Sequence, residues 1–230
     1  MSVILAIDSS TEICSVAINR DGYIQQLRSE LARQHAKETL PMVQKLLLEF
    51  NLTPAELNAI AFTHGPGSFT GLRIGGAVAQ GLAFAHSIPV ITVSSLAVMA
   101  LTAVRDHNLV QVQVALQARE DEIYLGAYIA EEIAGETSVC LQGSEQVVTI
   151  SSLPSVLTDI PGDWDGVGNA WVQGGALQEQ ITRSLRKYFP EVYPQASVLS
   201  MLAMQKYLAG DAVDAEHALP IYLKEQLEYK

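Results

Sequence analysis

Apolar positions in the first hundred residues alternate between short buried runs and helical spacing. Short apolar runs bounded by turn residues predict strands, whereas apolar positions three and four apart predict helices. An Asp21-Gly22 pair between two of the runs predicts a hairpin. We therefore expect strands at 3–8, 13–19, 23–27, 58–63 and 88–93, and helices at 35–50, 69–86 and from residue 95 onward.

The second half of the chain repeats this order of elements. There we expect strands at 110–116, 122–129, 137–141 and 164–167, and helices at 151–157, 170–188 and 197–208. Both halves run three strands, helix, strand, helix, and no short-period repeat is present. We predict a duplicated α/β fold with lobes at 1–106 and 107–230, and we allow the final helices to pack back on the first lobe.

The overall charge limits the partners that the chain can bind alone. The 230 residues are 49% hydrophobic and 17% charged, with a formal net charge of −11, which is typical of a folded acidic protein. Phosphate contacts dominate nucleic-acid affinity, so such a chain is a poor stand-alone nucleic-acid binder. The basic cluster Arg183, Arg186 and Lys187 is interpreted as a solvated helix face. We expect tRNA or other nucleic acid to arrive only through another protein.

Cysteine usage and the first residues indicate a cytoplasmic protein without membrane contact. Cys14 and Cys140 lie far apart, so neither a disulfide framework nor a thiolate metal site is indicated. The chain opens on a short strand pattern instead of a basic leader. No apolar run approaches the roughly 18 residues of a membrane span.

Asp8 is the first residue that could carry chemistry. It ends the first predicted strand, where polar groups commonly line the cleft of an α/β protein. The carboxylate could position a metal or a water, or it could cap the turn by accepting from the amides of Ser10 or Thr11. Both interpretations remain open. The Ser9-Ser10-Thr11 turn lacks glycine, so it is at best a weakened phosphate loop.

The glycine-rich segment 65–76 follows the fourth predicted strand. Gly65-Pro66-Gly67 predicts a turn, and Ser68 or Thr70 can cap the helix that follows. The free amides of a helix N-terminus can hold an anion. However, the segment lacks the Gly-Lys-Ser/Thr ending of a Walker loop, so this signal is weak.

Small residues form two rows along the predicted helix at 69–86. Gly71, Gly75, Ala79 and Ala83 form the first row, and Ala77, Gly81 and Ala85 form the second. A glycine inside a helix costs roughly 1 kcal/mol relative to alanine, which indicates that another backbone approaches closely. The spacing alone leaves two interpretations open, docking of a partner helix and packing against the chain's own sheet or a neighbouring helix.

Other catalytic patterns are not found in the sequence. The histidines are not spaced three to five residues apart, so no helical metal pair is present. We interpret His35 and His64 as capping or packing residues. Residues 66–70 do not form the Gly-x-Ser-x-Gly elbow of a serine hydrolase. Gly166-Val167-Gly168 is interpreted as a tight turn.

Several motifs together resemble one known family. They are Ile-Leu-Ala-Ile-Asp-Ser-Ser-Thr at 4–11, the run Gly-Pro-Gly-Ser-Phe-Thr-Gly-Leu-Arg from residue 65, Gln34-His35 with Leu40-Pro41, and Pro-Ile-Tyr-Leu-Lys at 220–224. On these motifs, the chain resembles the TsaB (YeaZ) family of glycoprotease-like proteins over its full length. It departs from the family at Gln117, where aspartate is usual, which leaves any role for a carboxylate there in doubt.

The resemblance implies a duplicated actin/Hsp70-like (ribonuclease H-like) fold and a role in making threonylcarbamoyladenosine (t6A) in tRNA. It implies a non-catalytic subunit that dimerises in isolation, binds a TsaD-like paralogue and is joined by a TsaE-like P-loop ATPase. The metal-binding histidine pair of the paralogue would fall at Ser95 and Met99 of this chain. The isolated chain is therefore expected to hold no metal or cofactor, with ATP or ADP bound only in the assembled complex.

We place the expected docking surface on the first-lobe helices. The residues expected to dock are His35, Gly71, Leu72, Arg73, Gly75, Gly76, Ala79 and Ala83. The alternative is an autonomous enzyme, either a nucleotide-dependent phosphotransferase that uses Asp8 or a peptidase, as the older glycoprotease label suggests.

Overall fold

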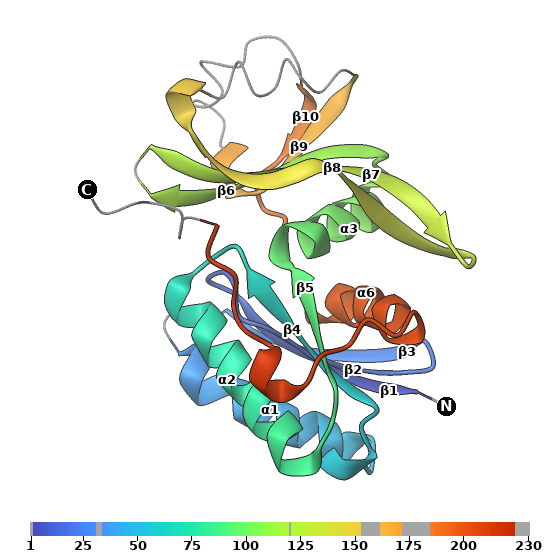
Figure 1. The fold of residues 1–230 in the computed structure, drawn as a ribbon. Helices are drawn as coiled ribbons and strands as arrows, with labels where there is room; N and C mark the ends of the chain where they lie inside the picture. The colour runs from blue at the N-terminus through green and yellow to red at the C-terminus, as the bar shows by residue number, and fades with distance from the viewer. Residues whose placement is uncertain (1, 31–33, 120, 153–161, 172–184, 224–230) are drawn as a thin grey trace. The chain divides into compact units, whose positions relative to one another are not determined.

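The computed structural model describes residues 2–30, 34–119, 121–152, 162–171 and 185–223 (Figure 1). The chain forms two compact units. The first consists of Met1–Val98 and Pro194–Ile221, and the second is centred on Met99–Tyr193. The division therefore falls within helix α3 (Ser95–His107) and not at residue 106. The reason is that the start of α3 is anchored in the first unit, where the Ser95 hydroxyl donates to the carbonyl of Pro66.

The sheet of the first unit has the strand order β3-β2-β1-β4-β5. Its strands are β1 (Val3–Asp8), β2 (Cys14–Arg20), β3 (Tyr23–Ser29), β4 (Ala59–Gly65) and β5 (Val90–Ser94). The first three strands are antiparallel neighbours, whereas β4 runs parallel to both β1 and β5. Every residue of β1 is buried, because helices cover both faces of this central strand, and its sequence is accordingly a continuous apolar run ending at Asp8.

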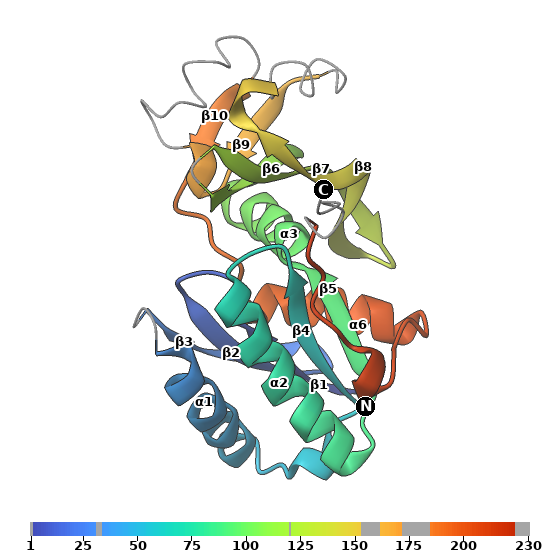
Figure 2. The ribbon, with the colours of Figure 1, turned by 60° about the vertical axis from the view of Figure 1, so that its left-hand side comes forward.

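Three helices cover this sheet. Helices α1 (His35–Glu49) and α2 (Phe69–His86) lie side by side on one face, and α6 (Ala196–Leu208) lies on the other (Figures 1 and 2). Short 3-10 turns η1 (Pro54–Glu56) and η4 (Ala215–His217) complete the unit. The core between the sheet and the α1/α2 layer contains Ile7, Val16, Leu46 and Phe62. In the described part of the chain, no helix is long and apolar enough to cross a membrane.

The sheet of the second unit repeats the topology of the first. Its strands are β6 (Gln111–Arg119), β7 (Glu122–Ile133), β8 (Glu136–Thr149), β9 (Trp164–Val167) and β10 (Leu185–Phe189), joined by 3-10 turns η2 (Ile150–Ser152) and η3 (Asn169–Trp171). β6, β7 and β8 are antiparallel neighbours, and β9 and β10 run parallel to β6 on its other side. This matching order confirms the predicted duplicated α/β fold.

The helix predicted at 170–188 is wrong at its end, because Leu185–Phe189 is strand β10. The sheet decides this, since β10 pairs with β9 and Tyr188 packs near Trp171, with ring centres 6.3 Å apart. Arg186 and Lys187 therefore lie on a strand and not on a helix face, and Arg186 pairs with the buried Asp165 at 2.5 Å. Residues 172–184, and most of the helix predicted at 151–157, lie outside the described residues.

Candidate docking face and its polar support

The first row of small residues on α2 faces inward. Gly71, Gly75, Ala79 and Ala83 are all buried. A Cβ built on Gly71 would lie 1.9 Å from the carbonyl oxygen of Ser9, and one on Gly75 would lie 2.5 Å from the Ser9 hydroxyl. Gly71 and Gly75 lack side chains where the chain's own β1–β2 turn lies against the helix, and Ala79 and Ala83 pack in the hydrophobic core of the first unit. Their prediction as docking residues is corrected, since they form an internal packing surface.

Three further predicted docking residues are also buried. A Cβ on Gly76 would contact the Phe62 ring at 3.4 Å, Leu72 is 2% exposed, and His35 is 7% exposed. His35 Nε2 lies 2.7 Å from the carbonyl oxygen of Thr11, which fits the predicted packing role of this side chain and not contact with a partner. Of the predicted docking residues, only Arg73 is exposed.

The second row of small residues faces outward. Ala77, Gly81 and Ala85 are exposed, and nothing lies within 4 Å of a Cβ built on Gly81. Phe84, 80% exposed, falls on the same side of the helix at 3.6 residues per turn. At the start of this side, the Arg73 guanidinium carbon lies 3.7 Å from the centre of the Phe69 ring.

Exposed leucines on α1 extend this apolar surface. Leu48 is 77% exposed and Leu40 is 42% exposed, although both belong to a helix whose other side is buried in the core. Helices α1 and α2 are neighbours on the same face of the sheet, so the exposed side chains of both helices lie on the outer side of that layer (Figure 2). We call these exposed residues the docking face, after the role that we propose for them; they are Leu40, Leu48, Phe69, Arg73, Ala77, Gly81 and Phe84.

Asp8 is the last residue of β1, in the sheet that α1 and α2 cover. The carboxyl group is fully buried, and its Oδ1 accepts from the Thr63 hydroxyl at 2.6 Å and the Ser10 hydroxyl at 2.7 Å. The Ser10 amide is 3.4 Å from the same atom, as the turn-capping interpretation predicts, and Oδ2 has no hydrogen-bond partner in the described structure. Burial raises the pKa of Asp8 to about 6, although the Thr63 and Ser10 hydrogen bonds act in the opposite direction.

The turn after Asp8 fills the space at the start of α2. The Ser68 amide donates to the Ser10 carbonyl at 2.7 Å, and the Ser9 hydroxyl donates to the Gly71 carbonyl at 2.8 Å. A Cβ on Gly67 would lie only 2.3 Å from the Ser10 carbonyl oxygen. The Ser68 oxygen accepts from the Gly71 amide at 3.3 Å, as the predicted helix cap requires. The amides of Ser68 and Gly71 are thus engaged within the chain.

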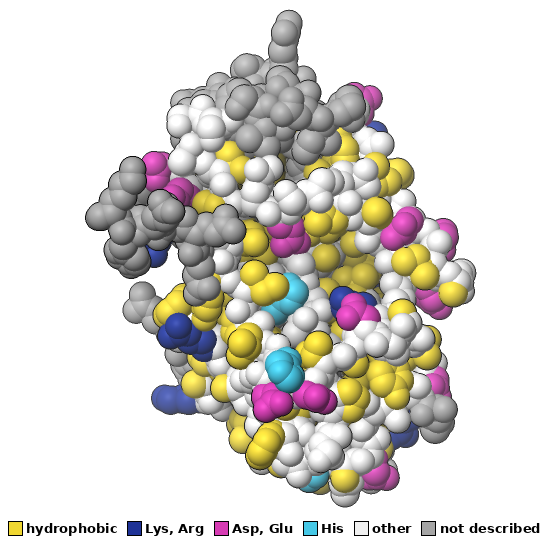
Figure 3. Space-filling model, viewed as in Figure 1, with side chains coloured by type: hydrophobic (Ala, Val, Ile, Leu, Met, Phe, Trp, Pro, Cys, Tyr) yellow, Lys and Arg dark blue, Asp and Glu magenta, His cyan; other side chains and the backbone are white. Residues whose placement is uncertain are grey.

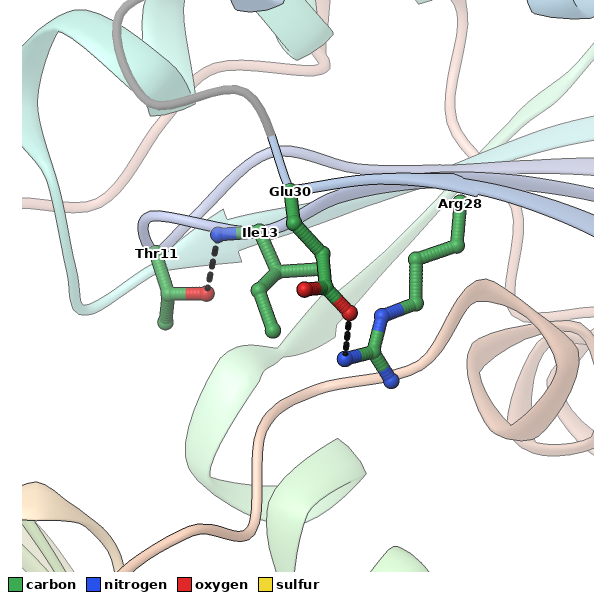
Figure 4. Close-up of polar contacts among 4 residues, drawn as sticks. All are labelled: Thr11, Ile13, Arg28 and Glu30. Atoms are coloured by element: carbon green, nitrogen blue, oxygen red, sulfur yellow. Dashed lines mark hydrogen bonds and ion pairs between the residues drawn. The ribbon is translucent and has the colours of Figure 1, made fainter.

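The continuation of the same turn is shown in Figure 4. The Thr11 hydroxyl accepts from the Ile13 amide at 3.4 Å as the chain enters β2. Nearby, Arg28 at the end of β3 pairs with Glu30 at 2.5 Å. Both charged side chains are substantially exposed, so this pair contributes little to stability.

Ser95 and Met99, where the resemblance predicts the paralogue's metal pair to fall, have structural contacts. Ser95 is buried and bonds to Pro66 within the first unit, and Met99 is buried against Gly168 within the second. Among the described residues, no group of three or more histidine, cysteine, aspartate or glutamate side chains could hold a metal. Gly168 has a φ of 104°, which confirms the predicted tight turn.

Gln117 and His64 are the remaining residues singled out by the sequence. The Gln117 amide group donates to the carbonyls of Arg119 and Glu122, bonds that an aspartate could not donate. His64 is the second-last residue of β4, and its buried Nδ1 has no hydrogen-bond partner among the described residues. Burial, together with the nearby Lys206 charge, lowers the pKa of His64 to about 4.

Comparisons with known proteins identify relatives of this chain. The family model for TsaD, tRNA N6-adenosine threonylcarbamoyltransferase, matches residues 28–224. The TsaB protein of Escherichia coli is 35% identical over 99% of this chain and 96% of its own length. The TsaB protein of Haemophilus influenzae is 33% identical over 99% and 95%.

A solved structure extends the similarity to three dimensions. YeaZ from Pseudomonas aeruginosa superposes with a TM-score of 0.87 at 38% identity, covering 97% of this chain and 100% of that one. Because the similarity to curated TsaB proteins extends over the full length of the chain and the fold is shared with YeaZ, the chain belongs to the TsaB (YeaZ) family, and its role lies in tRNA threonylcarbamoyladenosine biosynthesis.

Proposed function

We propose that this chain is a non-catalytic, activating subunit of the t6A machinery that works by docking on a TsaD-like transferase. Gly81 is the observation that carries the proposal. It lies in the middle of an exposed helix side, where glycine costs roughly 1 kcal/mol and no contact with the described residues requires it. A partner helix whose backbone approaches α2 closely would explain the absence of a side chain at this position.

Exposed side chains on α1 and α2 support the same proposal. Phe84 and Leu48 are among the most exposed large apolar residues of the described structure. Apolar side chains that gather on one surface are typical of interaction sites, whereas isolated ones need no explanation. The Arg73 guanidinium stacked on Phe69 adds an arginine and an aromatic ring, two residue types enriched at binding hot spots.

The proposed partners follow from this surface and from the charge of the chain. A TsaD-like paralogue would occupy the docking face, a TsaE-like ATPase would join the pair, and the isolated chain would form a homodimer. With a net charge of −11, the chain would contact tRNA only through its partners, in the cytoplasm where tRNA is modified. ATP or ADP would bind only in the assembled complex.

The rival function is an autonomous nucleotide-dependent enzyme, which the unpartnered Oδ2 of Asp8 favours. Against it, the Asp8 carboxyl is fully buried, and the Ser68 amide at the α2 N-terminus already donates to Ser10. Calorimetry of the isolated chain with ATP and Mg²⁺ separates the two functions. We expect no binding heat, whereas saturable binding that Asp8→Ala abolishes would favour the enzyme.

Reconstitution tests the proposed function itself. A TsaD-like transferase, a TsaE-like ATPase, threonylcarbamoyl-adenylate and tRNA are combined with and without this chain, and t6A is measured by mass spectrometry. We expect t6A to form at a substantial rate only when the chain is present. Equal rates in the two reactions would contradict an activating role, and modification of tRNA by this chain alone would contradict a non-catalytic one.

A further inference from the structure

The segment after α6 runs back over the first unit as a strap. We call residues 211–221 the C-terminal strap. Val213 pairs with Val90 through two backbone hydrogen bonds of 2.8 and 2.9 Å, and the Gln80 side chain donates to the Ala215 carbonyl at 3.0 Å. At its end, the Ile221 amide donates to the His64 carbonyl at 2.8 Å. The strap lies beside α2 in both ribbon views (Figures 1 and 2).

The strap joins two motifs that lie far apart in the sequence. A Cβ on Gly65 would lie 2.7 Å from the Ile221 carbonyl oxygen, and one on Gly76 would lie 3.7 Å from Pro220. The His64 carbonyl accepts from the strap at the point where the β4–β5 register shifts, between Thr63 and Gly65. The glycines of the segment thus allow close contact with the strap as well as with the β1–β2 turn.

At its end, the strap has one inward side chain and two outward apolar ones. Ala218 is fully buried in the core, whereas Leu219 is 60% exposed and Ile221 is 49% exposed. The strap contacts α2 on the side of Gly76 and Gln80. On a helical projection, the exposed positions of α2, such as Ala77, lie next to this side. The outward apolar side chains of the strap therefore continue the docking face.

Charge on the strap has a single sign. Residues 211–221 contain Asp211, Asp214 and Glu216 and no lysine or arginine. Asp211 pairs with Lys206 at 2.5 Å, while Asp214 and Glu216 are exposed. The space-filling view shows acidic and histidine side chains mixed with apolar ones over the strap region (Figure 3). A partner with basic residues at the edge of an apolar patch complements this strap, whereas a second copy of this acidic chain does not.

We propose that the outward side of the strap, formed by Leu219 and Ile221 with Asp214 and Glu216 at its rim, is a second ridge of the docking face. Its occupant is the TsaD-like paralogue, through an apolar patch bordered by lysine or arginine. The inference rests on the proposed function, because it requires that the paralogue bind this chain. It assigns a role to exposed residues of the segment after α6, which helix docking alone does not involve.

The test compares two equally drastic substitutions at exposed leucines. Leu219→Glu places a charge on the strap, and Leu208→Glu places the same charge at the end of α6, on the opposite face of the sheet, where Leu208 is 73% exposed. Calorimetry with the TsaD-like paralogue of the same organism measures Kd for each variant. We expect Leu219→Glu to weaken binding at least tenfold and Leu208→Glu to stay within about twofold of wild type.

A second variant probes the acidic rim. Asp214→Lys is expected to weaken paralogue binding about threefold at low ionic strength, and the difference should disappear near 0.5 M salt because exposed charges are screened. Leu219→Ser provides a neutral variant, and thermal unfolding confirms that each protein is folded before binding is measured.

The outcomes separate the inference from the proposed function. If wild type binds the paralogue and Leu219→Glu binds equally well, the strap assignment is overturned and the proposed function stands. If Leu219→Glu loses self-association in sedimentation velocity but keeps paralogue binding, the occupant is a second copy and the inference is wrong. If wild type does not bind the paralogue at all, both fall.

Discussion

The two rows of small residues on α2 share one spacing but lie in opposite environments. On the inward row, the Ser9 backbone and hydroxyl occupy the space that side chains at Gly71 and Gly75 would need. On the outward row, a Cβ on Gly81 would meet open space, and the exposed Phe84 lies on the same side of the helix. In the inward row, small residues are required because the backbone of this chain lies close to the helix. In the outward row, we propose that the backbone of a partner does so.

Adding a single methyl group to the inward row gives the largest expected effect. Gly71→Ala places a Cβ 1.9 Å from the Ser9 carbonyl oxygen, so the turn or the helix must move. We expect the free energy of unfolding to fall by about 3 kcal/mol, even though alanine favours the helix intrinsically. Urea unfolding measures this change, and wild-type stability in the variant would show that the inward row is not tightly packed.

The pH dependence of the free energy of unfolding tests the two buried titratable groups, Asp8 and His64. Folding raises the pKa of Asp8 from 3.8 to about 6. The stabilisation of the folded protein that this shift provides is fully present below pH 4 and is lost as the pH rises to 6. Folding lowers the pKa of His64 from 6.5 to about 4. The stabilisation that this shift provides is present above pH 6.5 and is lost as the pH falls to 4. At about 1.4 kcal/mol for each pKa unit, each contribution is on the order of 3 kcal/mol, with opposite signs.

Single variants separate these opposing contributions. Asp8→Asn keeps an acceptor for Thr63 and Ser10, and should leave a protein that loses stability steeply from pH 6.5 down to pH 4. His64→Gln should leave one that gains stability over the same interval. Unfolding free energies measured at half-unit pH steps give both slopes, and parallel profiles for the two variants would contradict the assignment.

The hydroxyl of Ser9 should have a smaller effect. Ser9→Ala removes the 2.8 Å hydrogen bond to the Gly71 carbonyl but keeps the backbone against the helix. We expect the free energy of unfolding to fall by about 1 kcal/mol, the usual contribution of one hydrogen bond, because the Gly71 carbonyl stays in the helix and only this bond is lost. Docking should be unchanged, and a loss of paralogue binding without a loss of stability would place Ser9 on the outward surface.

The smallest expected change is a gain. Gly81→Ala adds a methyl group to open space in a helix, so the free energy of unfolding should rise by up to about 1 kcal/mol. Thermal unfolding of this variant beside Gly71→Ala gives opposite signs for the same substitution on the same helix. Destabilisation by Gly81→Ala would mean that the outward row has a role within the chain.

The elements of the first unit could be predicted because their signals are local. The limits of α2 at Phe69 and His86 follow from helical periodicity after a turn and cap, and the topological repeat follows from the order of elements. Strand β10 could not be predicted, because its pairing with β9 decides its conformation. Local periodicity contains no information about which partner strand is available.

The site was less accessible to sequence analysis, because its contacts join distant segments. Ser9 and Gly71 are 62 residues apart, and Asp8 and Thr63 are 55 apart, so no local pattern shows that the turn lies against the helix. The spacing on α2 could reveal two rows, but only these contacts identify which row is buried. The first row has two glycines and the second has one, and this difference was the one sequence signal of which row is buried.

Gly81→Leu tests the central claim most directly. The substitution fills open space on the outward row, so the isolated chain should fold with at least wild-type stability. The account predicts that this stable variant binds the TsaD-like paralogue at least tenfold more weakly and no longer supports t6A formation in the reconstituted reaction. A folded Gly81→Leu variant that binds the paralogue and supports t6A formation like wild type would contradict it.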